Sequence, residues 1–155
     1  MSDMKTTLRG DLKEAMKAKD KNRTGTIRML LAAIQEEETK GTKHELTDED
    51  VLKVIAREIK KRRESAEVYA TNGRQELADA ELAEVEVLQS YQPEQLDDAA
   101  LQDLVAKVIA GMDPAPTMKD MGQVMKAATA EAAGRADGKR LSGAVKAALS
   151  APAGD

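Results

Sequence analysis

The near-absence of aromatic residues is the feature of this chain that most restricts the core it can build. Among 155 residues there are two tyrosines and neither phenylalanine nor tryptophan. The core must therefore consist of Leu, Ile, Val, Met and Ala. The sequence is also rich in Ala, Glu, Lys, Leu and Arg, which favour helices, and poor in strand-forming residues. It therefore predicts an all-α protein, with room for one domain or two small ones.

Apolar residues recur at helical spacing along most of the chain, and polar or glycine-containing stretches separate the periodic segments. The strongest start signal is Thr47-Asp48-Glu49-Asp50, in which Thr47 caps a helix and Asp50 occupies the capping-box position. The pattern predicts helices at about 5–20, 23–40, 48–71, 75–90, 98–110, 118–133 and 138–149. The first is expected to bury Leu8, Leu12, Ala15 and Met16, and the second Ile27, Leu30, Leu31 and Ile34.

Pro93 marks the predicted domain boundary, because proline requires an extended residue before it and so ends a helix. Residues 1–93 are expected to form a four-helix bundle, in which two long helices fold back antiparallel at Asn72-Gly73. Residues 94–150 are expected to form a small three-helix tail domain. We expect residues 151–155, which have no apolar pattern, to be disordered.

A glycine hinge with basic residues lies between the last two predicted helices, at 134–140. Gly134 can adopt the left-handed conformation that ends a helix, and the Asp137 carboxylate can cap the next one. Lys139 and Arg140 then stand where unpaired backbone N–H groups attract a phosphate. Lys126 and Lys146 can extend this basic region. The alternative is that these residues are ordinary caps and solvated charges.

A basic stripe is predicted on the third helix, away from its apolar arc. It consists of Lys53, Arg57, Lys60 and Lys61, which fall within about a third of the circumference at 100° per residue. Such a stripe can follow a phosphate backbone. The alternative is a solvated face, whose charge Glu64 and Glu67 partly neutralise.

Arg62 falls in the middle of the apolar arc of the same helix, where an unpaired guanidinium is costly. If the third and fourth helices are antiparallel, Arg62 lies opposite position 83. It then reaches Glu81 or Glu84 in a bidentate ion pair. We interpret these residues as a structural pair that fixes helix register. The alternative is that Glu81 and Glu84 act as acid and base or hold a metal, but the only histidine, His44, lies in a predicted loop.

Several functional classes are excluded by what the sequence lacks. It has no P-loop, dinucleotide fingerprint, nucleophile elbow or zinc-ligand spacing, so no cofactor or metal is expected. It has no cysteine, no apolar leader region in residues 1–21 and no run of about 18 apolar residues. These features predict a cytoplasmic protein with no membrane partner. The net charge of −4 argues against non-specific coating of nucleic acid.

Six stretches of the chain resemble the GatB/YqeY family, whose members include the tail of the B subunit of tRNA-dependent amidotransferases. Three stretches lie in the hinge and in the two predicted helices beside it: Met121-Gly122-Gln123-Val124-Met125-Lys126, Gly134-Arg135-Ala136-Asp137-Gly138 and Val145-Lys146-Ala147-Ala148-Leu149. Earlier stretches are 28–34, 58–64 and 84–96. The resemblance implies contact with tRNA by Lys126, Arg135, Lys139, Arg140 and Lys146. Nothing resembles the ATP- and metal-using domain of that subunit, so carbon-nitrogen ligase activity with glutamine as amide donor would be a label inherited by similarity.

The sequence thus favours a non-catalytic, tRNA-associated accessory protein that binds folded RNA by charge and shape. The main alternative is a module that binds a protein partner, for example in translation or the amidotransferase machinery. Such a partner would dock on the helical hairpin or on a methionine-rich face of Met112, Met118, Met121 and Met125. A third, enzymatic interpretation has Glu81 and Glu84 acting with Arg62.

Overall fold

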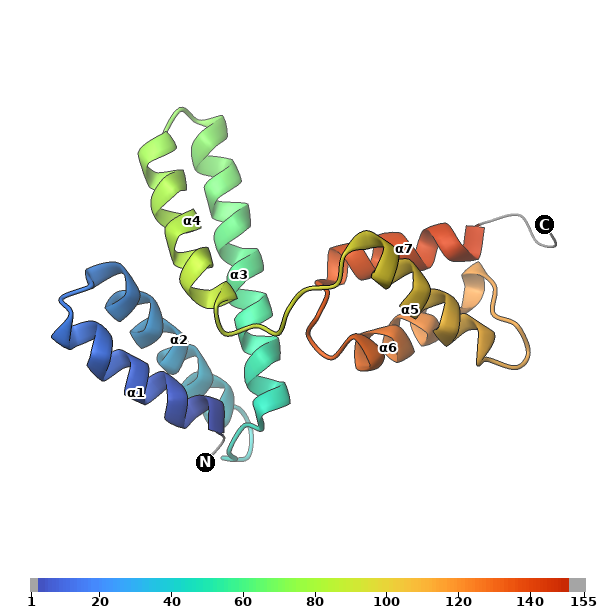
Figure 1. The fold of residues 1–155 in the computed structure, drawn as a ribbon, viewed down its shortest axis with the longest axis horizontal. Helices are drawn as coiled ribbons and strands as arrows, with labels where there is room; N and C mark the ends of the chain where they lie inside the picture. Colours follow the sequence, from blue (N-terminus) through green and yellow to red (C-terminus); the bar gives the residue numbers. More distant parts are fainter. Residues whose placement is uncertain (1–2, 151–155) are drawn as a thin grey trace. The chain divides into compact units, whose positions relative to one another are not determined.

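The computed structural model describes residues 3–150, and in this range the protein is built from helices without any strand. This confirms the predicted all-α fold (Figure 1). The elements are α1 (Asp3–Lys17), α2 (Lys21–Thr39), α3 (Asp48–Thr71), α4 (Gln75–Gln89), α5 (Asp98–Ala110), the 3₁₀ turn η1 (Met118–Asp120), α6 (Met121–Ala132) and α7 (Gly138–Ser150).

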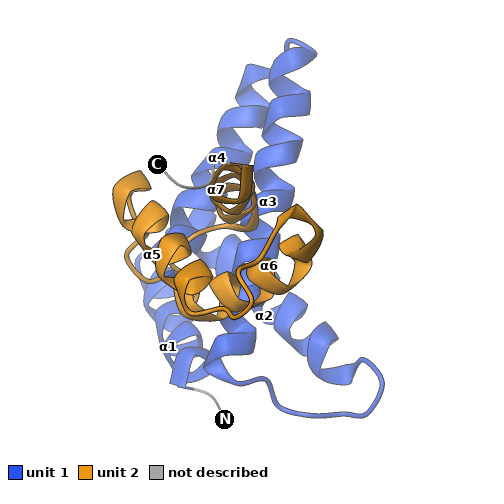
Figure 2. Ribbon diagram, turned by 90° about the vertical axis from the view of Figure 1, so that its right-hand side faces the viewer, with its two compact units in different colours: residues 1–92 blue, residues 93–155 orange. Residues whose placement is uncertain are grey.

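The chain divides into two compact units, which Figure 2 distinguishes by colour. Unit 1 comprises residues 1–92 and unit 2 comprises residues 93–155. The sequence places its domain boundary at Pro93, where an extended segment follows α4. The tail at 151–155, which we expect to be disordered, lies outside the described residues.

Unit 1 is a pair of helical hairpins, α1–α2 and α3–α4, with the longest helix, α3, packed along α4 (Figure 1). The turn between α3 and α4 is possible because Gly73 adopts a positive φ of 75°. The start of α3 is fixed by the predicted capping box: the Thr47 hydroxyl accepts from the Asp50 backbone N–H, and the Asp50 carboxylate accepts from the Thr47 N–H, both at 3.2 Å.

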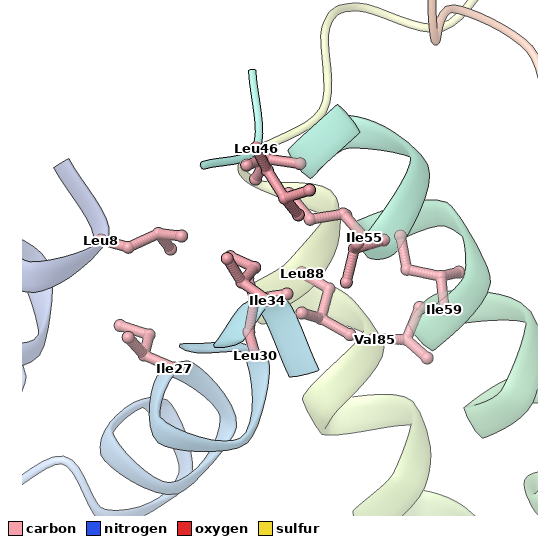
Figure 3. Close-up of a cluster of buried hydrophobic side chains, with 11 residues drawn as sticks. Leu8, Ile27, Leu30, Ile34, Leu46, Ile55, Ile59, Val85 and Leu88 are labelled. Carbon is pink, nitrogen blue, oxygen red and sulfur yellow. The ribbon is translucent and has the colours of Figure 1, made fainter. Parts of the chain in front are cut away.

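The core of unit 1 lies where the four helices converge, as Figure 3 shows. Its buried side chains are Leu8, Ile27, Leu30, Ile34, Leu46, Val51, Val54, Ile55, Ile59, Val85 and Leu88. Two predicted core residues, Leu12 and Leu31, are only partly buried, and Met16 is exposed. Met16 is 100° around α1 from the buried Ala15, so it falls at the edge of the apolar arc.

Unit 2 packs α5, α6 and α7 around a second core of small and medium-sized side chains. Its buried members are Leu101, Leu104, Val105, Val124, Ala128, Ala132, Ala136, Leu141 and Val145. The segment before α5 is attached to the α6–α7 hinge, since the Leu96 backbone N–H donates to the Arg135 carbonyl at 2.8 Å. The start of α5 is capped by Asp97, whose carboxylate accepts from the Ala100 N–H at 2.8 Å.

Candidate nucleic-acid interface

The hinge between α6 and α7 owes its shape to two left-handed residues and one aspartate cap. Ala133 and Gly134 have φ values of 49° and 83° at the end of α6. The Asp137 carboxylate then accepts from the Arg140 backbone N–H at 2.8 Å and so starts α7. These contacts confirm the roles predicted for Gly134 and Asp137. Nothing in the local sequence indicates this conformation for Ala133, because alanine seldom adopts a left-handed conformation.

Arg135 uses its guanidinium to cap the C-terminal end of α6. Nε donates to the carbonyl of Ala132 at 2.9 Å, and Nη2 donates to the carbonyl of Glu131 at 3.0 Å. A cation at this position is favourable, because the last carbonyls of a helix are unpaired and carry partial negative charge. Arg135 is therefore primarily a helix cap, and its role as a phosphate contact remains a prediction.

Arg140 connects the start of α7 to the start of α5. Its Nη2 donates to the Leu96 carbonyl at 2.6 Å and to the Asp98 carboxylate at 3.1 Å. The Arg140 side chain is one-third exposed and the Asp98 side chain is almost fully exposed. Arg140 thus has a structural role that the sequence did not indicate, since both acceptors lie more than 40 residues earlier in the chain.

The three lysines of unit 2 that are predicted to contact RNA are exposed and make no side-chain hydrogen bond or ion pair within residues 3–150: Lys126 on α6, and Lys139 and Lys146 on α7. The same holds for the other two lysines of unit 2 in this range, Lys107 and Lys119. Lys139 and Lys146 are seven residues apart, so they share one side of α7, about two turns apart along its axis. That side faces away from the buried Leu141 and Val145. We call Lys126, Lys139 and Lys146 the lysine surface of unit 2.

The predicted basic stripe on α3 lies on the exposed side of that helix, and all four of its residues are exposed. Arg57 is already paired, since its Nη1 donates to the Glu37 carboxylate at 2.8 Å. Lys40 also donates to Glu37 at 2.8 Å, and the hydrogen bonds from Lys40 and then Arg57 lower the pKa of Glu37. Within the described part of the chain, Lys53, Lys60 and Lys61 make no hydrogen bond or ion pair.

Arg62 lies between α3 and α4 and is bound by two carboxylates. Nε donates to Glu84 Oε2 at 2.8 Å, and Nη1 donates to Glu58 Oε1 at 3.0 Å. Only 5% of the Arg62 side chain is exposed. Burial is the largest single effect and by itself would lower the pKa of Arg62, but the hydrogen bonds to Glu58 and Glu84 and the charges of these two carboxylates together raise it. The guanidinium is therefore charged and fully compensated.

The predicted Arg62 pair is confirmed for Glu84 and is wrong in two details. Glu81 makes no ion pair with Arg62, and the pairing is not bidentate to one carboxylate, because Nε and Nη1 bind different glutamates. The second partner, Glu58, lies four residues before Arg62 on α3. That i,i+4 spacing was visible in the sequence and identifies Glu58 as a neighbour.

A second polar cluster of unit 1, which the sequence reasoning missed, joins α1 and α2 to the end of α4. The Tyr91 hydroxyl donates to the Asp11 carboxylate at 2.5 Å, and Arg23 Nη2 donates to the Tyr91 oxygen at 3.1 Å. Burial and then the bond to Asp11 raise the pKa of Tyr91, despite the nearby Arg23 charge. Nothing in the local sequence pairs residues that are 80 positions apart.

The methionine-rich face predicted for protein docking is largely absent. Met112, Met121 and Met125 are partly buried and pack against the core of unit 2. Met118 alone is substantially exposed. The apolar positions at helical spacing therefore serve as core, as such positions usually do.

Two properties of the described residues bear on other functions. No helix there is long and apolar enough to span a membrane. No group of three or more His, Cys, Asp or Glu residues in the described range is placed to hold a metal ion.

Comparison with known proteins gives a match to a family model over almost the whole chain. The model describes Yqey-like proteins and matches residues 5–149. Among curated relatives, the altered inheritance of mitochondria protein 41 of Eremothecium gossypii is 33% identical over 109 residues, which cover 70% of this chain and 59% of that protein. The protein of the same name from Kluyveromyces lactis is 33% identical over 66% of this chain and 55% of its own length.

A third relative, an uncharacterized protein of Schizosaccharomyces pombe, is 32% identical over 59% of this chain and 74% of its own length. This chain thus spans only 55–59% of the first two relatives. The names of those two place them in mitochondria, which contradicts the predicted cytoplasmic location. That prediction relied on the lack of cysteine and of a leader, and neither property identifies a compartment.

Proposed function

This chain belongs to the family of YqeY-like proteins, and on that basis we propose that it is a non-catalytic accessory protein that binds folded RNA of the tRNA class. The proposed contact is the lysine surface of unit 2, formed by Lys126, Lys139 and Lys146. Arg135 and Arg140 shape this surface, because their guanidinium groups hold the hinge and the start of α7.

One observation supports this proposal most strongly: α7 carries Lys139, Arg140 and Lys146 and no acidic residue. The chain as a whole is acidic, with a net charge of −4. A helix whose charged side chains are all cations is therefore a local exception. Its two lysines extend from the exposed side in the same direction, where they can neutralise phosphates without first breaking an internal ion pair.

The charge test compares tRNA binding by two triple variants that lose equal charge. In the first, Lys126, Lys139 and Lys146 become glutamine. In the control, Lys13, Lys17 and Lys43, which are exposed cations of unit 1, become glutamine. We expect the wild type to bind a tRNA transcript with affinity that falls steeply as salt rises. A plot of the logarithm of the association constant against the logarithm of the salt concentration has a negative slope. In the first variant this slope should become shallower by about 2–3, since each lost phosphate contact contributes roughly 0.7–0.9 to its magnitude.

The control variant should retain both affinity and slope. If it loses as much as the first variant, the interaction depends on net charge and the lysine surface is not the contact. Absence of salt-sensitive tRNA binding by the wild type at low salt would reject the proposal as a whole. A further variant with Lys53, Lys60 and Lys61 changed to glutamine measures whether the α3 stripe contributes.

A protein partner is the second candidate, because two large apolar side chains of the α3–α4 hairpin are exposed. Val68 on α3 is 60% exposed and Leu82 on α4 is 44% exposed. Apolar anchors of this kind dock into grooves of partner proteins. Changing both to serine should abolish capture of such a partner and leave tRNA binding unaffected, whereas the lysine variant should have the opposite effects.

A further inference from the structure

A groove of about 530 Å³ runs between α5 and α7 in unit 2. Its α7 wall is formed by the small residues Gly143, Ala144, Ala147 and Ala148, and its charged lining residues are Asp98 and Arg140. The groove adjoins the lysine surface. At 100° per residue, Gly143 lies only about 40° around α7 from Lys139 and about 60° from Lys146.

Arg140 lines this groove, and only one of its three guanidinium nitrogens donates hydrogen bonds within residues 3–150. Its Nη2 is held by the Leu96 carbonyl and Asp98, while within residues 3–150 Nε and Nη1 make no hydrogen bond. The other arginine of unit 2, Arg135, uses both Nε and Nη2 on carbonyls. Both tyrosines of the chain lie in unit 1. Arg140 is therefore the planar group of unit 2 that is best placed to stack with a ligand.

The lining also restricts what can occupy the groove. Asp98 is almost fully exposed beside Arg140, and its charge repels a phosphate. A nucleobase is planar and uncharged, and its edge groups can donate to a carboxylate. RNA-binding proteins commonly stack unpaired bases on arginine planes, whereas bases in an A-form helix are inaccessible in this way.

We propose that this groove receives one unpaired RNA base, stacked on the Arg140 guanidinium, while Lys139 and Lys146 contact phosphates beside it. The inference rests on the proposed function and makes it more specific, because it names single-stranded loop nucleotides as the RNA element that unit 2 recognises.

The test fills the groove without removing charge. Gly143→Leu places a side chain at the groove wall, and a Cβ at Gly143 meets no atom within 4 Å, so the helix accommodates it. Gly122→Leu is the matched control, since Gly122 lies on α6, has the same open surroundings and does not line the groove. Both replace a helical glycine and should raise helix stability.

Each protein is titrated with two RNAs that have the same number of phosphates: a hairpin with an unpaired loop, and a fully paired duplex. The wild type should bind the hairpin more tightly. Gly143→Leu should weaken hairpin binding about tenfold, as expected for the loss of one stacked base, and leave duplex binding unchanged. Gly122→Leu should bind both RNAs as the wild type does.

Four outcomes would overturn the inference. Equal affinity of the wild type for hairpin and duplex, or unchanged hairpin binding by Gly143→Leu, rejects the groove while the proposed function stands. Equal weakening of both RNAs by Gly143→Leu also rejects it, because the leucine would then act on phosphate contacts. Absence of binding to either RNA by the wild type rejects the proposed function and this inference together.

Discussion

Arg62 on α3 and Glu84 on α4 are joined by a 2.8 Å hydrogen bond between the guanidinium Nε and the carboxylate Oε2. Glu58, one turn earlier on α3, binds Nη1 of the same guanidinium. The charge of Arg62 is thus compensated both within its own helix and across the hairpin. The bond to Glu84 can form only when the two helices are in the observed register.

Glu84→Ala should destabilise unit 1, because Arg62 would keep one carboxylate but lose the other. We expect the free energy of unfolding to fall by about 1–3 kcal/mol, the range for loss of a hydrogen bond to a charged group. Glu81→Ala is the matched control on the same helix and should change stability by less than about 0.5 kcal/mol. Urea denaturation of both variants measures the difference. Equal effects would show that the cross-helix bond does not stabilise the hairpin.

Tyr91→Phe should also destabilise unit 1, since it removes the hydroxyl that donates to Asp11 and accepts from Arg23. The expected loss is about 1–2 kcal/mol in the free energy of unfolding, because the bond to Asp11 involves a charged acceptor. Tyr69→Phe is the control, as the Tyr69 hydroxyl makes no hydrogen bond within the described residues. An ultraviolet absorbance titration gives a second measurement: Tyr91→Phe should remove the tyrosine whose pKa is raised.

The stability of unit 1 should fall in acid partly because of Glu38. The hydrogen bond from Lys5, at 2.8 Å, is the largest of the effects that lower the pKa of Glu38, and the Leu46 backbone N–H adds to it. A lowered folded-state pKa stabilises the fold above the ordinary glutamate value of about 4.3. This stabilisation is lost as the pH falls through the folded pKa. Glu38→Gln should therefore be less stable than wild type at pH 7, and the difference should shrink below about pH 4.

Asp137→Ala should weaken the start of α7 by removing its cap. We expect a loss of about 1 kcal/mol in the stability of unit 2, the typical effect of removing a side-chain N-cap. Asp137→Asn keeps an acceptor oxygen at the same position and should restore most of the loss. Thermal unfolding followed by circular dichroism measures both variants. Identical melting of the alanine variant and wild type would show that the bond to the Arg140 N–H contributes nothing.

Features that depend on residues close in the sequence are predictable from it, and features that depend on distant residues are less so. Helix positions, the Thr47 capping box, the Gly134 conformation and the Asp137 cap were predicted correctly, because each depends on residues within about four positions. The Arg62–Glu84 pair was also accessible, since an antiparallel hairpin with a short turn fixes which positions face each other.

The partners of the basic residues were less predictable. The sequence pattern predicts Arg135, Arg140 and Arg57 as RNA contacts alongside the lysines, yet each guanidinium is bound to acceptors in the fold. Lysine and arginine contribute the same formal charge to a sequence pattern, but the forked guanidinium more readily binds carbonyls and carboxylates that folding brings near. Likewise, the apolar spacing that suggested a methionine docking face describes a core face equally well.

The sequence by itself determined the all-α class, the succession of helices and the capped ends, because these follow from side-chain volume, periodicity and backbone hydrogen bonds within one turn. Only the tertiary structure decided which cations are exposed, which guanidinium groups are held in place, and that a groove lies beside Arg140. The reason is physical: these properties depend on acceptors and surfaces supplied by residues distant in the chain, such as Leu96 and Asp98 for Arg140.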